Sequence, residues 1–123
     1  MKFGCDPIFE APGLLRLARL LELDVVGISF HVGSGCQDPP VYNRAICHSR
    51  NLFNLAKEIG FKPYLLDLGG GYPGDKGTSI DKYAEVINLA LEEYFPCKFL
   101  QFFAVSKAGI VERVVYTIIY QSY

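Results

Sequence analysis

Tryptophan is absent from the 123-residue sequence, methionine occurs once, and neither sign of charge is in large excess. The 12 lysines and arginines are nearly balanced by 13 aspartates and glutamates, so no basic patch of the kind that binds nucleic acid is predicted. The uncharged end at residues 114–123 is too short to cross a bilayer, and the first residues lack the apolar core of a signal peptide. We therefore expect a cytoplasmic protein with no nucleic-acid partner and no membrane contact.

The four cysteines, at positions 5, 36, 47 and 97, form no Cys-x-x-Cys pair. In a cytosolic chain this spacing favours free thiols, so we predict neither disulfides nor a zinc or other metal site. Cys36 differs from the others because it lies in a glycine-rich stretch, where an exposed thiol with a lowered pKa would be reactive.

The sequence does contain enough apolar material for the core of one domain, since half of its residues are hydrophobic and a fifth are charged. Apolar residues recur at three- and four-residue steps in three segments, and short, almost wholly apolar runs follow them. The first predicted helix begins either after Asp6 or at Pro12, and it ends at Asp24. The later predicted elements are a strand at 25–30, a helix at 42–59, a strand at 63–68, a helix at 80–94 and a strand at 99–105.

This alternation of helices and strands predicts a parallel sheet of the α/β class. A doubly wound sheet and a (β/α)8 barrel both remain open, and both bind ligands at the carboxyl ends of their strands. Glycine-rich loops stand at that end of two strands, Gly33-Ser34-Gly35 and Gly69-Gly70-Gly71. Their bare backbone N–H groups suit an anion, usually phosphate, although a tight turn without a ligand is the alternative. Neither loop fits the Gly-x-Gly-x-x-Gly pattern of dinucleotide sites or the Gly-Lys-Ser/Thr of a P-loop.

Histidine occurs twice, and only His31 stands at a junction between a predicted strand and a loop. A histidine in that place is either structural or positioned to stack on an aromatic cofactor whose phosphate the neighbouring loop holds. Ser34 adds a hydroxyl donor for a phosphate oxygen. His48 falls in the middle of a predicted helix among polar neighbours, and we expect it to be solvated.

Two stretches together resemble the eukaryotic ornithine decarboxylases: Ser-Phe-His-Val-Gly-Ser-Gly at 29–35 and Leu-Leu-Asp-Leu-Gly-Gly-Gly-Tyr-Pro-Gly at 65–74. Those enzymes belong to the pyridoxal-phosphate decarboxylases of ornithine, arginine, diaminopimelate and related amino acids. The resemblance runs from Lys2 to Pro96. It implies that residues 1–96 are a segment of a pyridoxal-binding (β/α)8 TIM-type barrel, here incomplete. Residues 97–123 would be a divergent tail with one further strand and a β-prone end.

Carried over by motif, the resemblance implies that the imidazole of His31 stacks on the pyridine ring of pyridoxal phosphate. It implies that the phosphate is held by the Ser34 hydroxyl and the backbone of Gly69, Gly70 and Gly71. Asp67, at the end of its strand, would orient the glycine loop rather than touch the substrate.

The resemblance implies no catalytic residue within this chain. The family's Schiff-base lysine lies upstream of the matched segment, and the Glu-Pro-Gly-Arg that the family carries after Pro96 has no counterpart here. We therefore expect a fragment of an enzyme that converts ornithine to putrescine and CO2 in polyamine synthesis, inactive as an isolated chain. In the full-length family the enzyme is a homodimer, and only the full-length protein would bind antizyme. The alternative is a non-catalytic regulator resembling the antizyme inhibitors.

Overall fold

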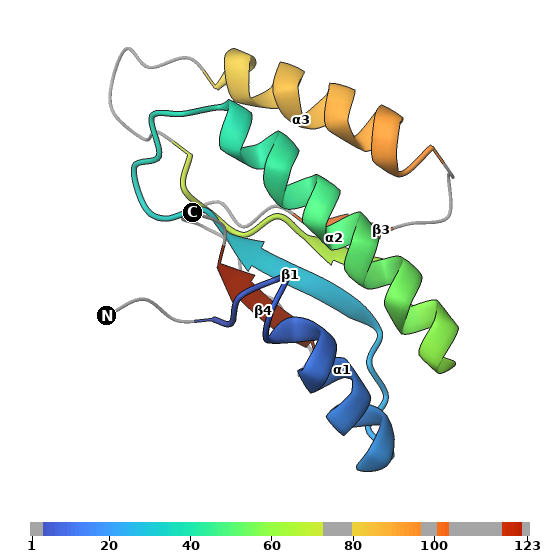
Figure 1. Ribbon diagram of the computed structural model, residues 1–123. Helices are drawn as coiled ribbons and strands as arrows, with labels where there is room; N and C mark the ends of the chain where they lie inside the picture. The colour runs from blue at the N-terminus through green and yellow to red at the C-terminus, as the bar shows by residue number, and fades with distance from the viewer. Residues whose placement is uncertain (1–3, 73–79, 97–100, 104–116, 122–123) are drawn as a thin grey trace.

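A computed structural model describes residues 4–72, 80–96, 101–103 and 117–121 of the chain (Figure 1). Helices and strands alternate along the chain up to the third strand, as the apolar patterns predict. A fourth strand follows near the end of the chain. The elements are α1 (Ala11–Leu20), β1 (Gly27–His31), α2 (Pro40–Ile59), β2 (Leu65–Asp67), α3 (Asp81–Tyr94), β3 (Gln101–Phe103) and β4 (Thr117–Gln121).

The four strands form one parallel sheet in the order β3-β2-β1-β4. The predicted parallel sheet is therefore confirmed, and β1 and β2 are its two inner strands. Strand β1 is buried along Gly27–Phe30, which explains its nearly continuous apolar sequence. Gly27 faces Leu65 in β2, and a Cβ atom at Gly27 would lie 2.2 Å from the Leu65 carbonyl oxygen. A glycine is thus required where these two strands meet.

The three helices form a single layer, in which α2 packs between α1 and α3 (Figure 1). A doubly wound sheet carries helices on both faces, whereas a barrel carries them all on the outside. Strands β1, β2 and β3 also lie side by side in chain order, as successive units of a barrel do. The arrangement therefore favours the barrel over the doubly wound sheet, with only part of the barrel sheet present.

The first helix begins at Ala11, with Pro12 in its first turn, so the second of the two predicted starts is the correct one. Asp6 does act as a capping residue, but it caps the turn that precedes the helix. Its carboxylate accepts hydrogen bonds from the backbone N–H groups of Ile8 at 2.8 Å and Phe9 at 2.7 Å. The helix ends at Leu20, earlier than the predicted end at Asp24.

Helix α2 ends where predicted, since Gly60 follows it in the left-handed conformation with φ of 106°. Helix α3 begins at Asp81, and Ile80 before it makes no capping side-chain hydrogen bond. Residues 73–79, which precede this helix, lie outside the described residues. Helix α3 ends at Tyr94, two residues before Pro96.

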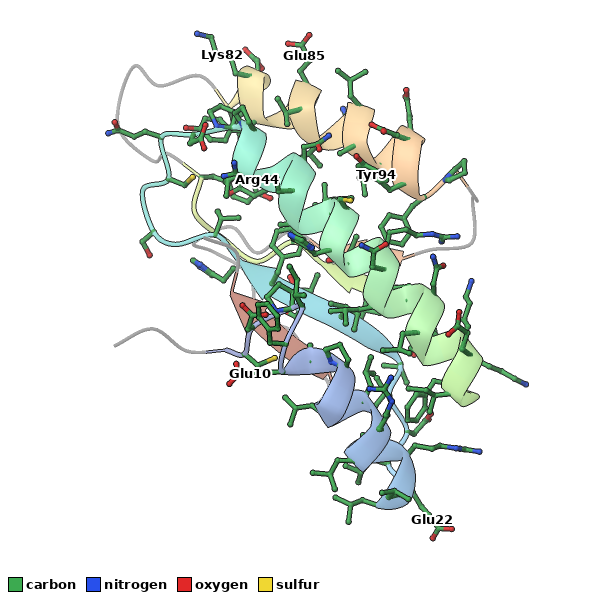
Figure 2. All side chains as sticks on the ribbon, viewed as in Figure 1. Glu10, Glu22, Arg44, Lys82, Glu85 and Tyr94 are labelled. Atoms are coloured by element: carbon green, nitrogen blue, oxygen red, sulfur yellow. The ribbon has the colours of Figure 1, made fainter. Side chains whose placement is uncertain are left out.

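The core lies between the helical layer and the sheet. Its largest fully buried side chains are Tyr42 and Phe53 of α2 and Phe30 of β1. Phe53 meets Phe95 edge-on, with ring centroids 5.2 Å apart. Charged side chains such as Lys82 and Glu85 project outward from α3 (Figure 2). No helix among the described residues has the length and apolarity needed to cross a membrane.

Candidate functional site

The two predicted glycine loops lie against each other beside the carboxyl ends of β1 and β2. We name residues 33–35 the first glycine loop and residues 69–71 the second. The backbone N–H of Cys36, just after the first loop, donates a hydrogen bond of 3.1 Å to the carbonyl oxygen of Gly71. Parallel strands bring their carboxyl ends to one edge of the sheet, which is why loops 36 residues apart in the sequence meet.

The second glycine loop is packed so closely that side chains are excluded from it. Gly69 and Gly71 both adopt positive φ, at 60° and 111°. A Cβ atom at Gly69 would lie 2.1 Å from the carbonyl oxygen of Phe30, and one at Gly71 would lie 2.6 Å from that of Gly33. The glycines are therefore required by their conformation and by the close approach of the two loops.

The first glycine loop faces open space. Gly33 and Gly35 also have positive φ, at 101° and 68°, yet a Cβ atom at either would meet nothing within 4 Å. Ser34 between them is exposed. The second loop is thus tightly packed, whereas the first has open space beside Gly33 and Gly35.

Asp67, the last residue of β2, is hydrogen-bonded to the start of the second glycine loop. Its carboxylate accepts a hydrogen bond of 2.8 Å from the Gly69 N–H and one of 2.9 Å from the Ser29 hydroxyl of β1. Both carboxylate oxygens are engaged within the protein, so Asp67 connects the two strands and sets the start of the loop. This geometry agrees with the expectation that Asp67 orients the loop.

His31, the last residue of β1, is exposed, and its ring orientation is set by the first glycine loop. The N–H of Gly33 donates a hydrogen bond of 2.9 Å to its Nδ1. Nδ1 is therefore the acceptor nitrogen, which leaves Nε2 to carry the proton of the neutral ring. The ring is held beside the loop instead of turning freely in solvent.

Two tyrosines from the helices support the loop region, and Tyr72, just after the second loop, packs against one of them. Tyr42 of α2 donates a hydrogen bond of 3.1 Å to the Gly70 carbonyl, and Tyr83 of α3 donates one of 2.7 Å to the Cys36 carbonyl. The ring of Tyr42 stacks on Tyr72 at 5.3 Å between centroids and meets Tyr83 edge-on at 6.0 Å. The second loop and the residue that follows the first loop are thus each bonded to a different helix through one tyrosine hydroxyl.

Burial is the main reason that the pKa of Tyr42 and of Tyr72 is raised above that of an ordinary tyrosine. The neighbouring Tyr72, Cys36 and Tyr83 add to the shift at Tyr42, and the Asp67 carboxylate adds to it at Tyr72. The raised pKa keeps the Tyr42 hydroxyl protonated even at pH values at which an ordinary tyrosine ionises. It remains a hydrogen-bond donor to the second glycine loop.

A family model described as "Pyridoxal-dependent decarboxylase, pyridoxal binding domain" matches residues 1–107 of the chain. The chain belongs to the pyridoxal-dependent decarboxylases. It is 51% identical to ornithine decarboxylase of Panagrellus redivivus over 98 residues, covering 78% of this chain and 22% of that protein. It is 48% identical to antizyme inhibitor 2 of Xenopus laevis, with 78% of this chain and 21% of that protein covered.

Among solved structures, the arginine decarboxylase of Paramecium bursaria Chlorella virus bound to agmatine superimposes with a TM-score of 0.77. It shares 42% sequence identity, and the match covers 84% of this chain and 28% of that one. The chain therefore has the fold of part of the barrel domain of a pyridoxal-dependent decarboxylase. It spans about a fifth of the length of the curated relatives named above.

The residues of this decarboxylase segment suit the phosphate of pyridoxal phosphate. Within the described part of the chain, nothing accepts a hydrogen bond from the backbone N–H groups of Gly70 and Gly71. A Cβ atom at Gly71 would collide with the neighbouring loop, so only backbone forms the surface at that residue. Helix α2 adds little to anion binding, because Pro39 and Pro40 at its start have no N–H.

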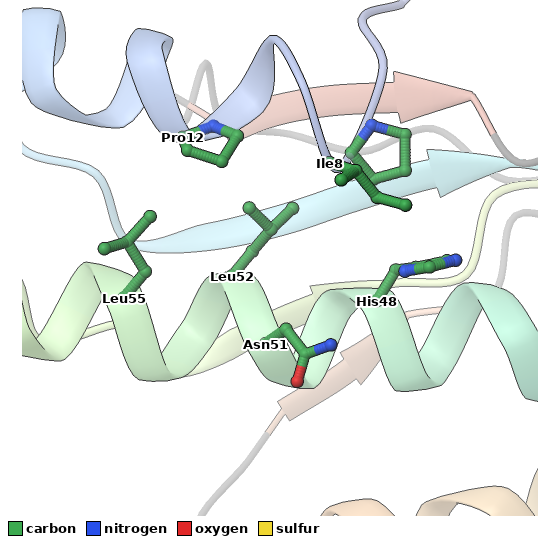
Figure 3. A pocket seen from close by; sticks show the side chains of 7 residues that line it. Ile8, Pro12, His48, Asn51, Leu52 and Leu55 are labelled. Atoms are coloured by element: carbon green, nitrogen blue, oxygen red, sulfur yellow. The ribbon is translucent and has the colours of Figure 1, made fainter.

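His48 lies away from the glycine loops, whereas Cys36 directly follows the first of them. His48 was expected to be solvated, but it is half-buried, because α1 packs across that part of α2. It lines a pocket of about 240 Å³ with Ile8, Pro12, Leu52 and other residues, none of them from the glycine loops (Figure 3). Cys36 is half-buried and donates through its sulfur to the Asp38 carbonyl at 3.6 Å.

Cysteines 5, 36 and 47 are not joined in disulfides, and Cys97 lies outside the described residues. In the described ranges, no group of three or more His, Cys, Asp or Glu side chains is placed to hold a metal ion.

The sequence analysis missed the supporting tyrosines. Tyr42 and Tyr83 fall on the apolar stripes of their helices, where they read as core residues, and both are indeed buried. The signal that was available is chemical, since a buried tyrosine hydroxyl usually finds a hydrogen-bond partner. The pairing of Ser29 with Asp67 was missed as well, because only the register of β1 on β2 brings the two side chains together.

Proposed function

We propose that the two glycine loops hold the phosphate of pyridoxal phosphate, as part of an ornithine decarboxylase. The observation that carries this proposal is the arrangement of the two loops, residues 33–35 and 69–71, which we call the phosphate cradle. Two glycine loops are joined by the hydrogen bond from Cys36 to Gly71, and the N–H groups of Gly70 and Gly71 meet no acceptor in the described structure. The Ser34 hydroxyl, exposed on the open side, adds a further donor.

His31 is the residue that we place against the face of the pyridine ring. Its ring is exposed at the end of β1, two residues from the first glycine loop, and its Nδ1 is occupied by the Gly33 N–H. When bound, pyridoxal phosphate supplies the electron-withdrawing ring that stabilises the carbanion left by loss of CO2. The residues of this chain bind and orient the cofactor, and none of them is proposed to transfer a proton.

Ornithine is the proposed substrate because the similar protein of Panagrellus redivivus is an ornithine decarboxylase. The 42% identity to an arginine decarboxylase shows that the shared barrel segment accompanies more than one substrate in this family. Residues outside this segment would select the amino acid. A homodimer, antizyme binding and a cytoplasmic location are likewise proposed for the full-length protein alone.

A second candidate function is that of a regulator like the antizyme inhibitors, and the 48% identity to antizyme inhibitor 2 favours it. The two functions differ in their need for the cofactor. A decarboxylase requires the phosphate cradle to be intact, whereas a regulator that only binds a protein does not. The N–H groups of Gly70 and Gly71, which meet no acceptor in the described structure, therefore favour the enzyme.

Binding of inorganic phosphate and of pyridoxal phosphate to the purified chain tests the proposal. We expect weak binding that is lost in Gly70→Val, which places a β-branched side chain where backbone meets the phosphate oxygens. Gly13→Val in helix α1 is the matched control, because a Cβ at Gly13 meets nothing within 4 Å and the helix is remote from the loops. Equal binding by wild type and Gly70→Val would show that the loop is only a turn.

Activity is the second measurement. We expect the isolated chain to release no CO2 from labelled ornithine above a blank without protein, because the resemblance places the Schiff-base lysine outside this segment. Measurable release by the pure chain would contradict this part of the proposal.

A further inference from the structure

Four consecutive peptide groups run through the second glycine loop. We name them the first, second, third and fourth peptides, and they join residues 68–69, 69–70, 70–71 and 71–72. A trans peptide is a rigid plane whose carbonyl and N–H point in opposite directions, and the described residues contain no cis peptide bond. A hydrogen bond to either group therefore fixes the direction of both.

Three of these four peptides are each held by a hydrogen bond from another group of the chain. The N–H of the first peptide donates to the Asp67 carboxylate at 2.8 Å. The carbonyl of the third peptide accepts from the Tyr42 hydroxyl at 3.1 Å, and the carbonyl of the fourth accepts from the Cys36 N–H at 3.1 Å. The N–H of Gly71 belongs to the third peptide, so its direction is set in advance by Tyr42.

The second peptide is not held through either of its groups. Across the part of the chain that the structure describes, the Gly69 carbonyl accepts no hydrogen bond and the Gly70 N–H donates none. The torsions that turn this peptide are ψ of Gly69 and φ of Gly70, and neither residue has a Cβ atom to restrict them. Of the four peptides, it is therefore the one that can turn without breaking a hydrogen bond of the described structure.

We propose that the second peptide is the adjustable donor of the phosphate cradle. In the free chain it turns between an orientation that presents the Gly70 N–H to the cradle and one that presents the Gly69 carbonyl. A phosphate oxygen attracts the N–H and repels the carbonyl, so binding selects the first orientation. The inference rests on the proposed function, because it assigns the Gly70 N–H a role at that same site.

The direction of the N–H bonds tests this inference better than affinity does. If the two orientations are about equally populated, selecting one of them raises the dissociation constant of phosphate only about twofold. Residual dipolar couplings report the direction of each N–H bond, and nitrogen relaxation dispersion reports its exchange on the μs–ms timescale. In the free chain we expect the Gly70 coupling to be reduced by averaging, with relaxation dispersion at its nitrogen. The Gly69 and Gly71 couplings should each fit one fixed direction.

Inorganic phosphate is the probe ligand. At saturation it should abolish the dispersion at Gly70 and restore a coupling that fits a single N–H direction. The couplings at Gly69 and Gly71 should keep their values, because hydrogen bonds within the protein already fix those two N–H groups.

Tyr42→Phe tests whether hydrogen bonds decide which peptide turns. It releases the carbonyl of the third peptide, so the Gly71 coupling should fall and dispersion should appear there as well. Tyr72→Phe is the matched control: it also removes a hydroxyl, from the ring stacked on Tyr42, but in the described structure that hydroxyl bonds to no peptide of the loop. Its Gly71 coupling should match wild type, and a wild-type Gly71 coupling in folded Tyr42→Phe would overturn the inference.

Failure of this inference and failure of the proposed function give different results. In one case phosphate shifts the amide signals of the glycine loops, but Gly70 has one fixed N–H direction in the free chain or still averages at saturation. That result overturns the adjustable peptide and leaves the phosphate site in place. In the other case phosphate shifts none of these amide signals. The proposed function then fails, and the selection of an orientation by phosphate fails with it.

Discussion

Replacing Gly71 with alanine is the substitution for which the structure gives the clearest expected magnitude. Gly71 has φ of 111°, and an added Cβ would lie 2.6 Å from both the Gly33 carbonyl oxygen and the Cγ2 atom of Val32. The left-handed conformation costs a residue with a Cβ about 1–2 kcal/mol, and forcing an extra methyl into a packed site adds about 1–3 kcal/mol. We therefore expect Gly71→Ala to lower the free energy of unfolding by about 2–5 kcal/mol.

Gly33→Ala is the matched control, because Gly33 has a similar φ of 101° but open space around its would-be Cβ. Its free energy of unfolding should fall only by the cost of the left-handed conformation, about 1–2 kcal/mol. Both substitutions restrict the unfolded chain equally, so that contribution cancels in the comparison. Urea unfolding followed by circular dichroism measures both losses. If the two variants lose equal stability, the two glycine loops do not pack against each other as described.

Three further predictions concern the groups that support the loops and the apolar surface of the chain. Tyr42→Phe removes the donor to the Gly70 carbonyl and should cost about 1 kcal/mol in urea unfolding, with weaker phosphate binding; unchanged values for both would exclude a supporting role. The pKa of Tyr42 and of Tyr72 is raised in the folded chain. The stability that their protonation provides is therefore complete below the ordinary value of 10 and is lost as pH rises above it. Absorbance near 295 nm should accordingly show tyrosines that ionise only well above pH 10 or on unfolding. Phe9 and Leu20, exposed by 84% and 81%, leave apolar surface uncovered, so size-exclusion chromatography at micromolar concentration should show self-association; a sharp monomer peak with a cooperative melt would refute this.

Elements with a strong local signal could be predicted from the sequence. Helix α2 has an apolar period along its length and a glycine at its end, and the structure ends it at that glycine. The end of α1 was misplaced, because the chain leaves the helix after Leu20 although no proline or glycine marks that point. The two glycine loops were found because they interrupt apolar strands, and the parallel sheet then brings them together.

What the sequence could not show depends on contacts between distant residues. The hydroxyl of Tyr83 reaches Cys36 across 47 positions, and Ser29 reaches Asp67 across 38. Neither pairing has a local pattern, since each follows from how α3 and β2 are placed against β1. The C-terminal segment was recognised as β-prone, but its partner strand could not be known. Nothing in residues 117–121 indicates pairing with β1 instead of β3.

The central claim is that the joined glycine loops bind the phosphate of pyridoxal phosphate. Calorimetric titration of the purified chain with pyridoxal phosphate, and separately with pyridoxal, tests it most directly because the two ligands differ only in the phosphate. We expect measurable binding of pyridoxal phosphate and much weaker binding of pyridoxal. Equal affinity for the two, or no binding of pyridoxal phosphate by a chain that is demonstrably folded, would contradict it.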